Sequence, residues 1–420
     1  MKKLLIAGGK FADIPTIKSA KILGYYVITS GNNPNDLGHS FADEVVLCDY
    51  SDMDSMLQLA KKSKIDAIIS SCDDVSTLTC SYVANKLKIG NFDSFDIAKI
   101  IHYKDLWRKF LKENSIPCPK AIGFDNINEA ILKIPNNFKD SKIIIKPVDF
   151  ATGKGVSIAY ANEDLDKKLQ FAFMNSKSNR IVVEEFIDGS NHGFSTILQN
   201  QKVVFYFYDN EQHCFNPFAV SSTTTSKKFT SKIIKEVINQ IEQIARILNL
   251  KDGIFHTQII LHKNANGVVA PFIIEACRRM GGDLYNEFIS QACGIDYPSL
   301  CIQAHNQNKI TNIFHSIESK VLDRRILIPK KYQYNGGIIN HIKPRQYFSR
   351  ACIMSKKLGK IKNIDLSSLS EHLLDSLIWA KSGDIIDDTS KYKAGIVFLS
   401  AKNEHDLQNR IGLLHNCIRF

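Results

Sequence analysis

Short apolar segments alternate with helical segments through the first ninety residues, and this alternation constrains the fold more than any other feature. Strands separated by helices of about ten to fifteen residues form βαβ units, whose sheet is parallel. The sequence therefore predicts a doubly wound α/β domain that binds ligands at the carboxyl ends of its strands. We expect strands at residues 4–7, 26–29, 44–47 and 66–70, and helices at residues 14–23, 53–62 and 76–87.

A glycine pair follows the first strand, which raises the question of a dinucleotide site. Gly8, Gly9 and Lys10 do not have the G-x-G-x-x-G spacing, and the second strand ends in Ser30 and Gly31 instead of an acid that would hold a ribose. A doubly wound domain without the dinucleotide fingerprint is the better interpretation. A dinucleotide-dependent oxidoreductase stays as an alternative.

Residues 93–320 have a different pattern, in which helices alternate with strands joined by turns. The turn-rich segment 262–267 predicts an antiparallel hairpin between strands at 255–262 and 268–275. A mixed sheet with flanking helices indicates an α+β body. The other expected strands cover residues 142–146, 156–160, 180–186, 194–198 and 203–207, and the expected helices cover residues 103–114, 232–248 and, in the last part of the chain, 404–414.

Charge, apolar run length and cysteine spacing argue against several classes of function. The chain has 54 Lys and Arg residues against 43 Asp and Glu residues, which gives a formal charge of +11. Because the excess positive charge is spread along the chain, we expect no nucleic-acid partner. No apolar run approaches the about 20 residues that span a bilayer, and the first one is too short for a secretory signal. We therefore expect a cytoplasmic protein without membrane contact. The ten cysteines form no C-x-x-C pair, which favours buried thiols over disulfides or zinc ligands.

A lysine and a glycine-rich loop provide a candidate site for phosphate groups. Lys146 ends an apolar run, from which it would direct a positive charge. Taken alone, an ordinary strand-end lysine that reaches solvent is the better interpretation. The loop that follows contains Thr152, Gly153, Lys154 and Gly155. Two glycines around a lysine allow backbone N–H groups to point at an anion. Together these residues indicate a phosphate-binding loop.

An apolar strand that ends in Glu184 and Glu185 is a candidate adenine site. Residues at such a strand end could present backbone groups to the adenine edge, with Phe186 or Ile187 lining the slot, and Glu184 could accept a hydrogen bond from the adenine amino group. His192 follows across a glycine-containing turn. The alternative is an amphipathic strand with a solvated acidic end.

The most specific cluster is the strand end at Glu275, which is followed four residues later by Arg279 and then by Gly281 and Gly282. A carboxylate there supplies a hard oxygen ligand for Mg²⁺. An arginine supplies a planar cation for a developing phosphate charge. A structural salt bridge between the two residues is the alternative.

In this order, the motifs resemble those of the ATP-grasp carboxylate–amine ligases, among them amino-acid ligases, biotin carboxylase and the purine-biosynthesis carboxylases. The resemblance covers nearly the whole chain. It implies a pre-ATP-grasp domain at residues 1–92 and a two-lobed ATP-grasp core at residues 93–320, with lobes at 93–180 and 181–320. Residues 321–420 would form a small C-terminal lid domain.

The resemblance also implies the cofactors, ATP and Mg²⁺ (Mn²⁺ is a possible substitute), and the roles of individual residues. Arg279 and Lys146 would be catalytic, and Glu275 and Gln258 would hold the metal. The residues implied to bind ATP are Lys104, Lys146, Thr152, Gly153, Lys154, Gly155, Glu184, Glu185, Phe186, Ile187 and His192.

Two positions depart from the family pattern. Relatives usually place a second metal carboxylate where this chain has Gln258, and often an asparagine where it has Cys277. An amide oxygen can coordinate a hard cation, but it carries no charge to offset one. A non-catalytic, ATP-binding regulatory module is therefore a second alternative.

The implied reaction has two steps: a substrate carboxylate attacks the γ-phosphate of ATP, and an amine or similar nucleophile then attacks the acyl phosphate. We expect small-molecule carboxylate and amine substrates, with amino-acid ligation ahead of carboxylation, and a homodimer is a possible assembly. The hydroxyl-rich segment 221–226 could contact substrate or be a surface turn, and the basic lid favours an anionic substrate. The other candidate contacts are Arg278, Arg324, Arg325, Lys343 and Arg345.

Overall fold

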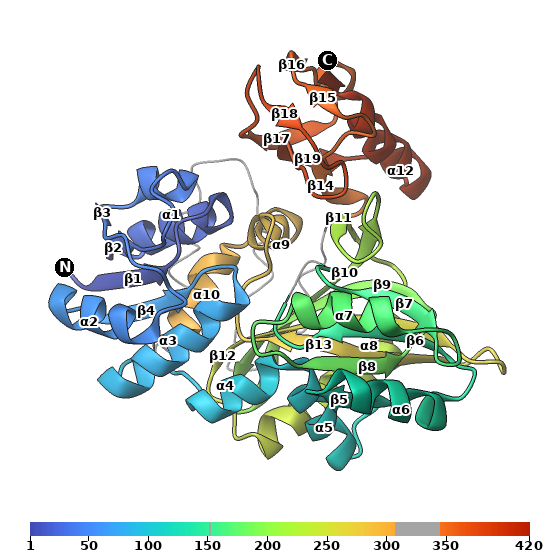
Figure 1. Cartoon of the computed structure of the whole chain (residues 1–420). Helices are drawn as coiled ribbons and strands as arrows, with labels where there is room; N and C mark the ends of the chain where they lie inside the picture. The colour runs from blue at the N-terminus through green and yellow to red at the C-terminus, as the bar shows by residue number, and fades with distance from the viewer. Residues whose placement is uncertain (151–152, 307–344) are drawn as a thin grey trace.

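The computed structural model describes residues 1–150, 153–306 and 345–420. Three groups of elements follow one another along the chain, with the N-terminal group in blue, the central group in green and yellow, and the C-terminal group in orange and red (Figure 1). Among the described residues, no helix combines the length and the apolar character that a bilayer crossing requires.

The N-terminal group contains a four-stranded sheet in which every pairing is parallel, in the order β3-β2-β1-β4. This confirms the predicted parallel sheet. The core of this sheet contains the completely buried side chains of Leu5, Ile28 and Ile68. The elements are β1 (Lys3–Ala7), η1 (Phe11–Asp13), α1 (Ile14–Ile22), β2 (Tyr26–Thr29), η2 (Leu37–Phe41), β3 (Glu44–Val45), α2 (Met53–Ser63), β4 (Ala67–Ser70) and α3 (Asp74–Leu87).

The first lobe of the central group is built on a second sheet, in the order β5-β8-β6-β7 with antiparallel pairing throughout. Strand β8 lies between β5 and β6, so the lobe boundary expected at residue 180 would divide this sheet; we place β8 in the first lobe. The elements are α4 (Phe95–His102), α5 (Lys104–Glu113), β5 (Ala121–Phe124), α6 (Ile127–Phe138), β6 (Lys142–Pro147), β7 (Ser157–Tyr160), α7 (Asp166–Met174) and β8 (Ile181–Glu185).

The largest sheet has eight strands in the order β13-β12-β9-β10-β11-β14-β19-β17. It confirms the predicted hairpin, since β12 and β13 pair antiparallel. It also corrects two expectations. The segment expected as a loop at 221–226 is largely a strand, β11, and β10 continues six residues beyond the expected end at Phe207. The central elements are β9 (Ser190–Gln199), β10 (Lys202–His213), β11 (Val220–Thr225), α8 (Ser231–Ile247), β12 (Gly253–Lys263), β13 (Val269–Cys277), α9 (Tyr285–Cys293) and α10 (Tyr297–His305).

The C-terminal group is joined to the central sheet because β14 pairs with β11. The eight-stranded sheet therefore runs across the domain boundary that we expected at residue 320. The elements are β14 (Phe348–Ile353), β15 (Gly359–Lys360), β16 (Asn363–Ile364), η3 (Ser367–Leu369), β17 (Leu373–Ile378), β18 (Ile385–Ile386), β19 (Gly395–Ser400), α12 (Glu404–Leu413), η4 (Leu414–Asn416) and β20 (Ile418–Arg419).

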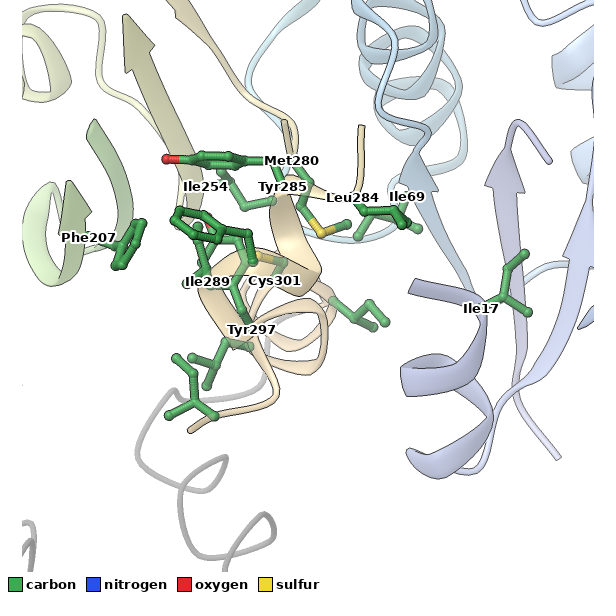
Figure 2. Close-up of a cluster of buried hydrophobic side chains, with 14 of the residues drawn as sticks. Ile17, Ile69, Phe207, Ile254, Met280, Leu284, Tyr285, Ile289, Tyr297 and Cys301 are labelled. Carbon is green, nitrogen blue, oxygen red and sulfur yellow. The ribbon is translucent and has the colours of Figure 1, made fainter. Parts of the chain in front are cut away.

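One buried apolar cluster connects the N-terminal group to the central sheet. Ile17 and Ile69 come from the N-terminal group, Phe207 and Ile254 come from the large sheet, and the side chains of α9 and α10 lie between them, among them Tyr297 (Figure 2). Buried apolar area of this kind contributes about 25 cal/mol per Å². The two groups consequently share a core, and the carboxyl ends of the N-terminal strands are held beside the central group.

Candidate active site

Lys104 connects the first lobe to the large sheet. It begins α5, and its Nζ lies 3.1 Å from Oε1 of Glu275 on β13. The same Nζ donates to the carbonyl oxygen of Phe150, 3.0 Å away, immediately before the glycine-rich loop. Burial opposes the charged form of Lys104, but the carboxylates of Glu275, Asp74 and Glu184 together raise the pKa of the lysine. Two residues that the motifs placed in one site therefore do lie together.

Lys146 and Glu184 form a second buried ion pair. Nζ of Lys146 lies 2.9 Å from Oε2 of Glu184, and Nε of Arg108 lies 3.0 Å from the other carboxylate oxygen. Burial would raise the pKa of Glu184, but the charges of Arg108 and Lys146 lower it to about 2. Because this carboxylate already binds Arg108 and Lys146, the adenine amino group would have to compete with them for the expected hydrogen bond. Sequence analysis missed Arg108, although it lies one helical turn after Lys104.

The residues at the end of β8, which were expected to line an adenine slot, have the following surroundings. Glu185 is exposed, and the ring of Phe186 is covered by Nζ of Lys142 at 4.0 Å from its centre. Ile187 follows as a partly exposed residue.

The glycines of the loop are required by its backbone. Gly153 and Gly155 have φ values of +73° and +74°, and a side chain on Gly153 would collide with Phe218. Nζ of Lys154 lies over the ring of Phe150. Thr152 lies outside the described residues.

His192 has other partners in this structure. It is completely buried, with Nδ1 2.7 Å from the carbonyl oxygen of Asp209 and Nε2 2.7 Å from Oγ of Ser190. Burial lowers the pKa of His192 to about 4, so the ring is neutral at pH 7. A contact with ribose or phosphate would have to displace one of these hydrogen bonds.

The two proposed metal ligands lie opposite each other on the adjacent strands β12 and β13. Gln258 and Glu275 are register partners, and a bulge in the hairpin follows directly after this pair. Bulges redirect side chains and are frequent beside active sites. Nε2 of Gln258 lies 3.2 Å from a carboxylate oxygen of Glu211 on β10, a residue that sequence analysis missed because β10 was expected to end at Phe207.

The donor set suits a hard cation, since it offers carboxylate and amide oxygens. Within the described ranges, no three His, Cys, Asp or Glu residues are grouped closely enough to hold a metal by themselves. Mg²⁺ is usually held by one or two carboxylates together with substrate phosphates. The residues therefore fit a cation that is shared with a bound nucleotide.

Arg279 is held by the N-terminal group. Its Nε lies 2.6 Å from Oδ1 of Asp74, the first residue of α3, and its Nη1 donates to the carbonyl oxygen of Met280. Burial would raise the pKa of Asp74, but Arg279 and the neighbouring cationic groups together lower it. His102 and Lys104 contribute in the same direction, so these charges lie within reach of one another. Sequence analysis also missed Asp74.

Arg278 does not have the position expected of a substrate contact. It is buried, and all of its donor groups have partners: Nε binds Asp93 at 2.7 Å, and the two terminal nitrogens bind the carbonyl oxygens of Ile254 and Lys251. It therefore fastens the chain before α4 to the large sheet. Of the basic lid residues, Arg345 is described and donates its backbone N–H to Ala292. The others, Arg324, Arg325 and Lys343, lie outside the described residues.

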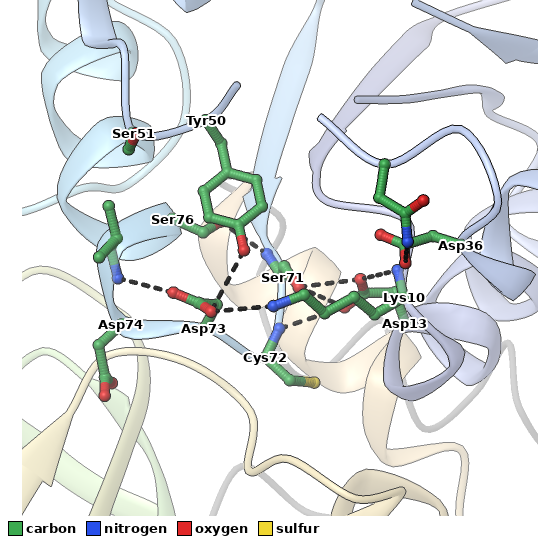
Figure 3. Close-up of polar contacts among 12 residues, drawn as sticks. Lys10, Asp13, Asp36, Tyr50, Ser51, Ser71, Cys72, Asp73, Asp74 and Ser76 are labelled. Atoms are coloured by element: carbon green, nitrogen blue, oxygen red, sulfur yellow. Dashed lines mark hydrogen bonds and ion pairs between the residues drawn. The ribbon is translucent and has the colours of Figure 1, made fainter. Parts of the chain in front are cut away.

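The glycine pair of the N-terminal group serves packing in this structure. A side chain on Gly9 would collide with the ring of His39. Beyond the pair, Lys10 binds Asp73 at 3.1 Å, and Tyr50 donates to the same carboxylate (Figure 3). Figure 3 also shows Asp74 beside this network, pointing away from it. The carboxyl ends of the strands therefore present charged side chains toward the central group.

Residues 103–214 match the family of the phosphoribosylglycinamide synthetase ATP-grasp (A) domain. The chain is 41% identical over 108 residues to the glutathione biosynthesis bifunctional protein of Clostridium perfringens, which is 25% of this chain and 14% of that protein. It is 24% identical over 368 residues, or 79% of each chain, to the phosphoribosylamine–glycine ligase of Methanococcus vannielii.

The chain thus spans only about a seventh of the first relative, and 15% of a second bifunctional protein, from Streptococcus mutans. Among solved structures, the L-amino acid ligase of Bacillus licheniformis superposes with a TM-score of 0.76 at 16% identity, covering 100% of this chain and 98% of that one. The phosphoribosylglycinamide synthetase of Anaerococcus prevotii gives a TM-score of 0.72 at 18% identity, with the same coverage. The whole chain therefore has the fold of these ligase structures, and residues 103–214 match an ATP-grasp domain family.

Proposed function

We propose that this protein is an ADP-forming ligase that activates a substrate carboxylate with ATP and joins it to an amine or a similar nucleophile. The observation that carries this proposal is the 3.1 Å contact between Lys104 of the first lobe and Glu275 of the large sheet. A cation for phosphate and a carboxylate for Mg²⁺ meet there, beside the start of the glycine-rich loop. Phosphoryl transfer depends mainly on positioning and charge stabilisation, which such a pair provides.

The triphosphate of ATP would lie along Lys104, Lys146 and the loop at residues 152–156. Both lysines are bound to carboxylates in the nucleotide-free chain. Phosphate oxygens would therefore compete with these carboxylates for the two ammonium groups. The adenine would lie against Phe186 and Ile187.

Glu275 and Gln258 would hold Mg²⁺, or Mn²⁺ in its place, and the bound ion would offset charge on the phosphates. Arg279 would stabilise charge that develops on the transferred phosphoryl group and on the acyl phosphate. Asp74 keeps the guanidinium in place until then. The loop at 152–156 would close over the intermediate and exclude water, because an acyl phosphate hydrolyses readily.

Cysteine chemistry is not part of the proposal. Cys277 lies two residues after Glu275, but burial raises the pKa of its thiol to about 11. A thiol with that pKa is protonated at neutral pH and is a poor nucleophile. The two steps need no covalent bond to the enzyme.

A non-catalytic ATP-binding module is the second candidate, and Gln258 is the observation that favours it. The dinucleotide-dependent oxidoreductase loses its support, because the glycine pair packs on His39 and the fold is that of ATP-grasp proteins. We further propose amino acids or similar small metabolites as substrates, a cytoplasmic location and a homodimer, whose mass light scattering would measure.

The test is ADP formation by the purified protein with ATP and Mg²⁺, across the twenty amino acids singly and in pairs. ADP release that requires an added carboxylate, with a condensed product detected by mass spectrometry, is the expected result. Nucleotide binding without turnover for any pair would favour the regulatory module. The absence of nucleotide binding would contradict both candidates.

A further inference from the structure

Glu211 contacts the proposed metal centre from a strand that the family motifs do not include. It is partly buried on β10, and both of its carboxylate oxygens lie near Nε2 of Gln258, at 3.4 and 3.2 Å. Gln258 is the position at which the chain lacks an expected charge. The carboxylate of Glu211 therefore lies next to the position where the expected charge is missing.

The contact determines which way the amide of Gln258 faces. Nε2 of Gln258 is the amide atom that donates to both oxygens of Glu211, so the amide turns its NH₂ group toward Glu211. The amide oxygen then faces away from Glu211. Glu275 is the register partner of Gln258 on the opposite side, so this oxygen is available to a cation held there.

Burial and the neighbouring Asp209 raise the pKa of Glu211, although the hydrogen bond from Gln258 and the charge of Arg350 act in the opposite direction. Among the residues that the structure describes, Glu211 takes part in no ion pair. Its neighbour on β11 is Thr223, whose hydroxyl is already bound by Nη2 of Arg350 at 2.6 Å. Arg350 is further engaged by the carbonyl oxygen of Asp283. A partly buried carboxylate without a cationic partner is costly, unless a cation binds nearby.

We propose that Glu211 is a positioning residue for the divalent cation: it orients the amide oxygen of Gln258 toward the ion and supplies, from β10 across the intervening strand β9, the negative charge that a glutamate at position 258 would have supplied. This inference rests on the proposed function, because it requires the nucleotide-linked cation. It explains how a glutamine at position 258 is compatible with a working metal centre.

The experiment measures Mn²⁺ binding to the full chain by electron paramagnetic resonance, with a saturating non-hydrolysable ATP analogue. Loss of a residue that orients a metal ligand lowers metal affinity by about 10- to 100-fold. We expect Glu211→Gln to weaken Mn²⁺ binding by such a factor, while ADP binding in EDTA is unchanged. The exchange variant Gln258→Glu with Glu211→Gln should recover most of the affinity, because the charge and the hydrogen bond are both restored with their positions reversed.

The control is Glu371→Gln, which removes a carboxylate whose side chain is 89% exposed and distant in sequence from the site. Unchanged Mn²⁺ affinity in Glu211→Gln, or no recovery in the exchange variant, would overturn the inference. If Glu211→Gln does not fold, Glu211→Asp replaces it: the shorter side chain withdraws from Gln258, so an unchanged affinity would again overturn the inference.

The outcomes separate this inference from the proposed function. A wild-type chain that binds no nucleotide in EDTA contradicts the proposed function itself. A wild-type chain that binds nucleotide but no Mn²⁺ contradicts the metal centre and the inference with it. Normal nucleotide and Mn²⁺ binding in both the wild type and Glu211→Gln contradicts only the role of Glu211.

Discussion

Replacing Glu184 by glutamine keeps the shape of the side chain but removes the charge that faces Lys146 and Arg108. The Glu184 side chain is only 2% exposed, so water cannot take over that role. Burial opposes the charged form, yet the two cations lower the pKa of Glu184 from 4.5 to about 2. At 1.36 kcal/mol per pKa unit, this corresponds to about 3 kcal/mol of stability at neutral pH. Removing one partner of a buried pair costs about 3–5 kcal/mol, so Glu184→Gln should lower the free energy of unfolding by about that amount.

The assay is urea denaturation followed by the fluorescence of Trp107, which is buried on α5 next to Arg108. A Trp379→Phe background removes the other tryptophan of the chain. Because folding depresses the pKa of Glu184, its contribution is complete above about pH 4.5 and is lost as the pH falls toward 2. The difference between wild type and Glu184→Gln should therefore be large at pH 7 and smaller at pH 3.

Glu185→Gln is the matched control for stability, since it changes the next carboxylate along the strand, which is exposed. It should leave the urea midpoint close to that of the wild type. Equal midpoints for Glu184→Gln and wild type at pH 7 would refute the reasoning. A difference of the same size at pH 7 and pH 3 would also refute it, because the effect would then not come from the charge of Glu184.

Three further predictions concern the chemistry of the site. Arg279→Ala should lower kcat by about 10²- to 10³-fold, the effect of losing one transition-state donor, and rates of ADP formation near those of wild type would exclude the proposed role. His192→Phe should cost about 1–3 kcal/mol in urea denaturation, because Ser190 and the carbonyl of Asp209 lose a partner; a changed Kd for ADP would show instead that the histidine contacts nucleotide. Gln258→Glu should alter the dependence of activity on Mg²⁺ and Mn²⁺, and identical titrations for variant and wild type would indicate that residue 258 is not a metal ligand.

Much of the fold could be predicted from hydrophobic periodicity. The N-terminal strands and helices, the β12–β13 hairpin and helix α8 lie where the sequence placed them, within two residues at each end. The pattern failed where a strand is polar. Residues 208–213 and 220–225 carry acids and hydroxyls. They are strands because residues 209–213 pair with β11, and β11 also pairs with β14, and such pairing with distant segments is not visible in a local pattern.

The candidate site could be predicted at the residues that belong to family motifs. Lys104 and Glu275 are far apart in the chain, and only their match to family motifs brought them together before the structure did. The missed residues are partners of those motif residues: Arg108, Asp74 and Glu211. Each comes from a different element, and its role follows from a contact between elements. Spacing along the chain contains no information of that kind.

The junction between β11 and β14 determines what the last part of the chain does for the whole molecule. Three register pairs join these strands, from Ser222 with Ala351 to Thr224 with Ser349. A chain cut before β14 would leave the backbone N–H and C=O groups of β11 open along a bare sheet edge, where a second molecule can add a strand. Residues 345–420 thus cover this edge of the sheet and protect it from aggregation. The large sheet should be kept intact when the protein is divided for expression.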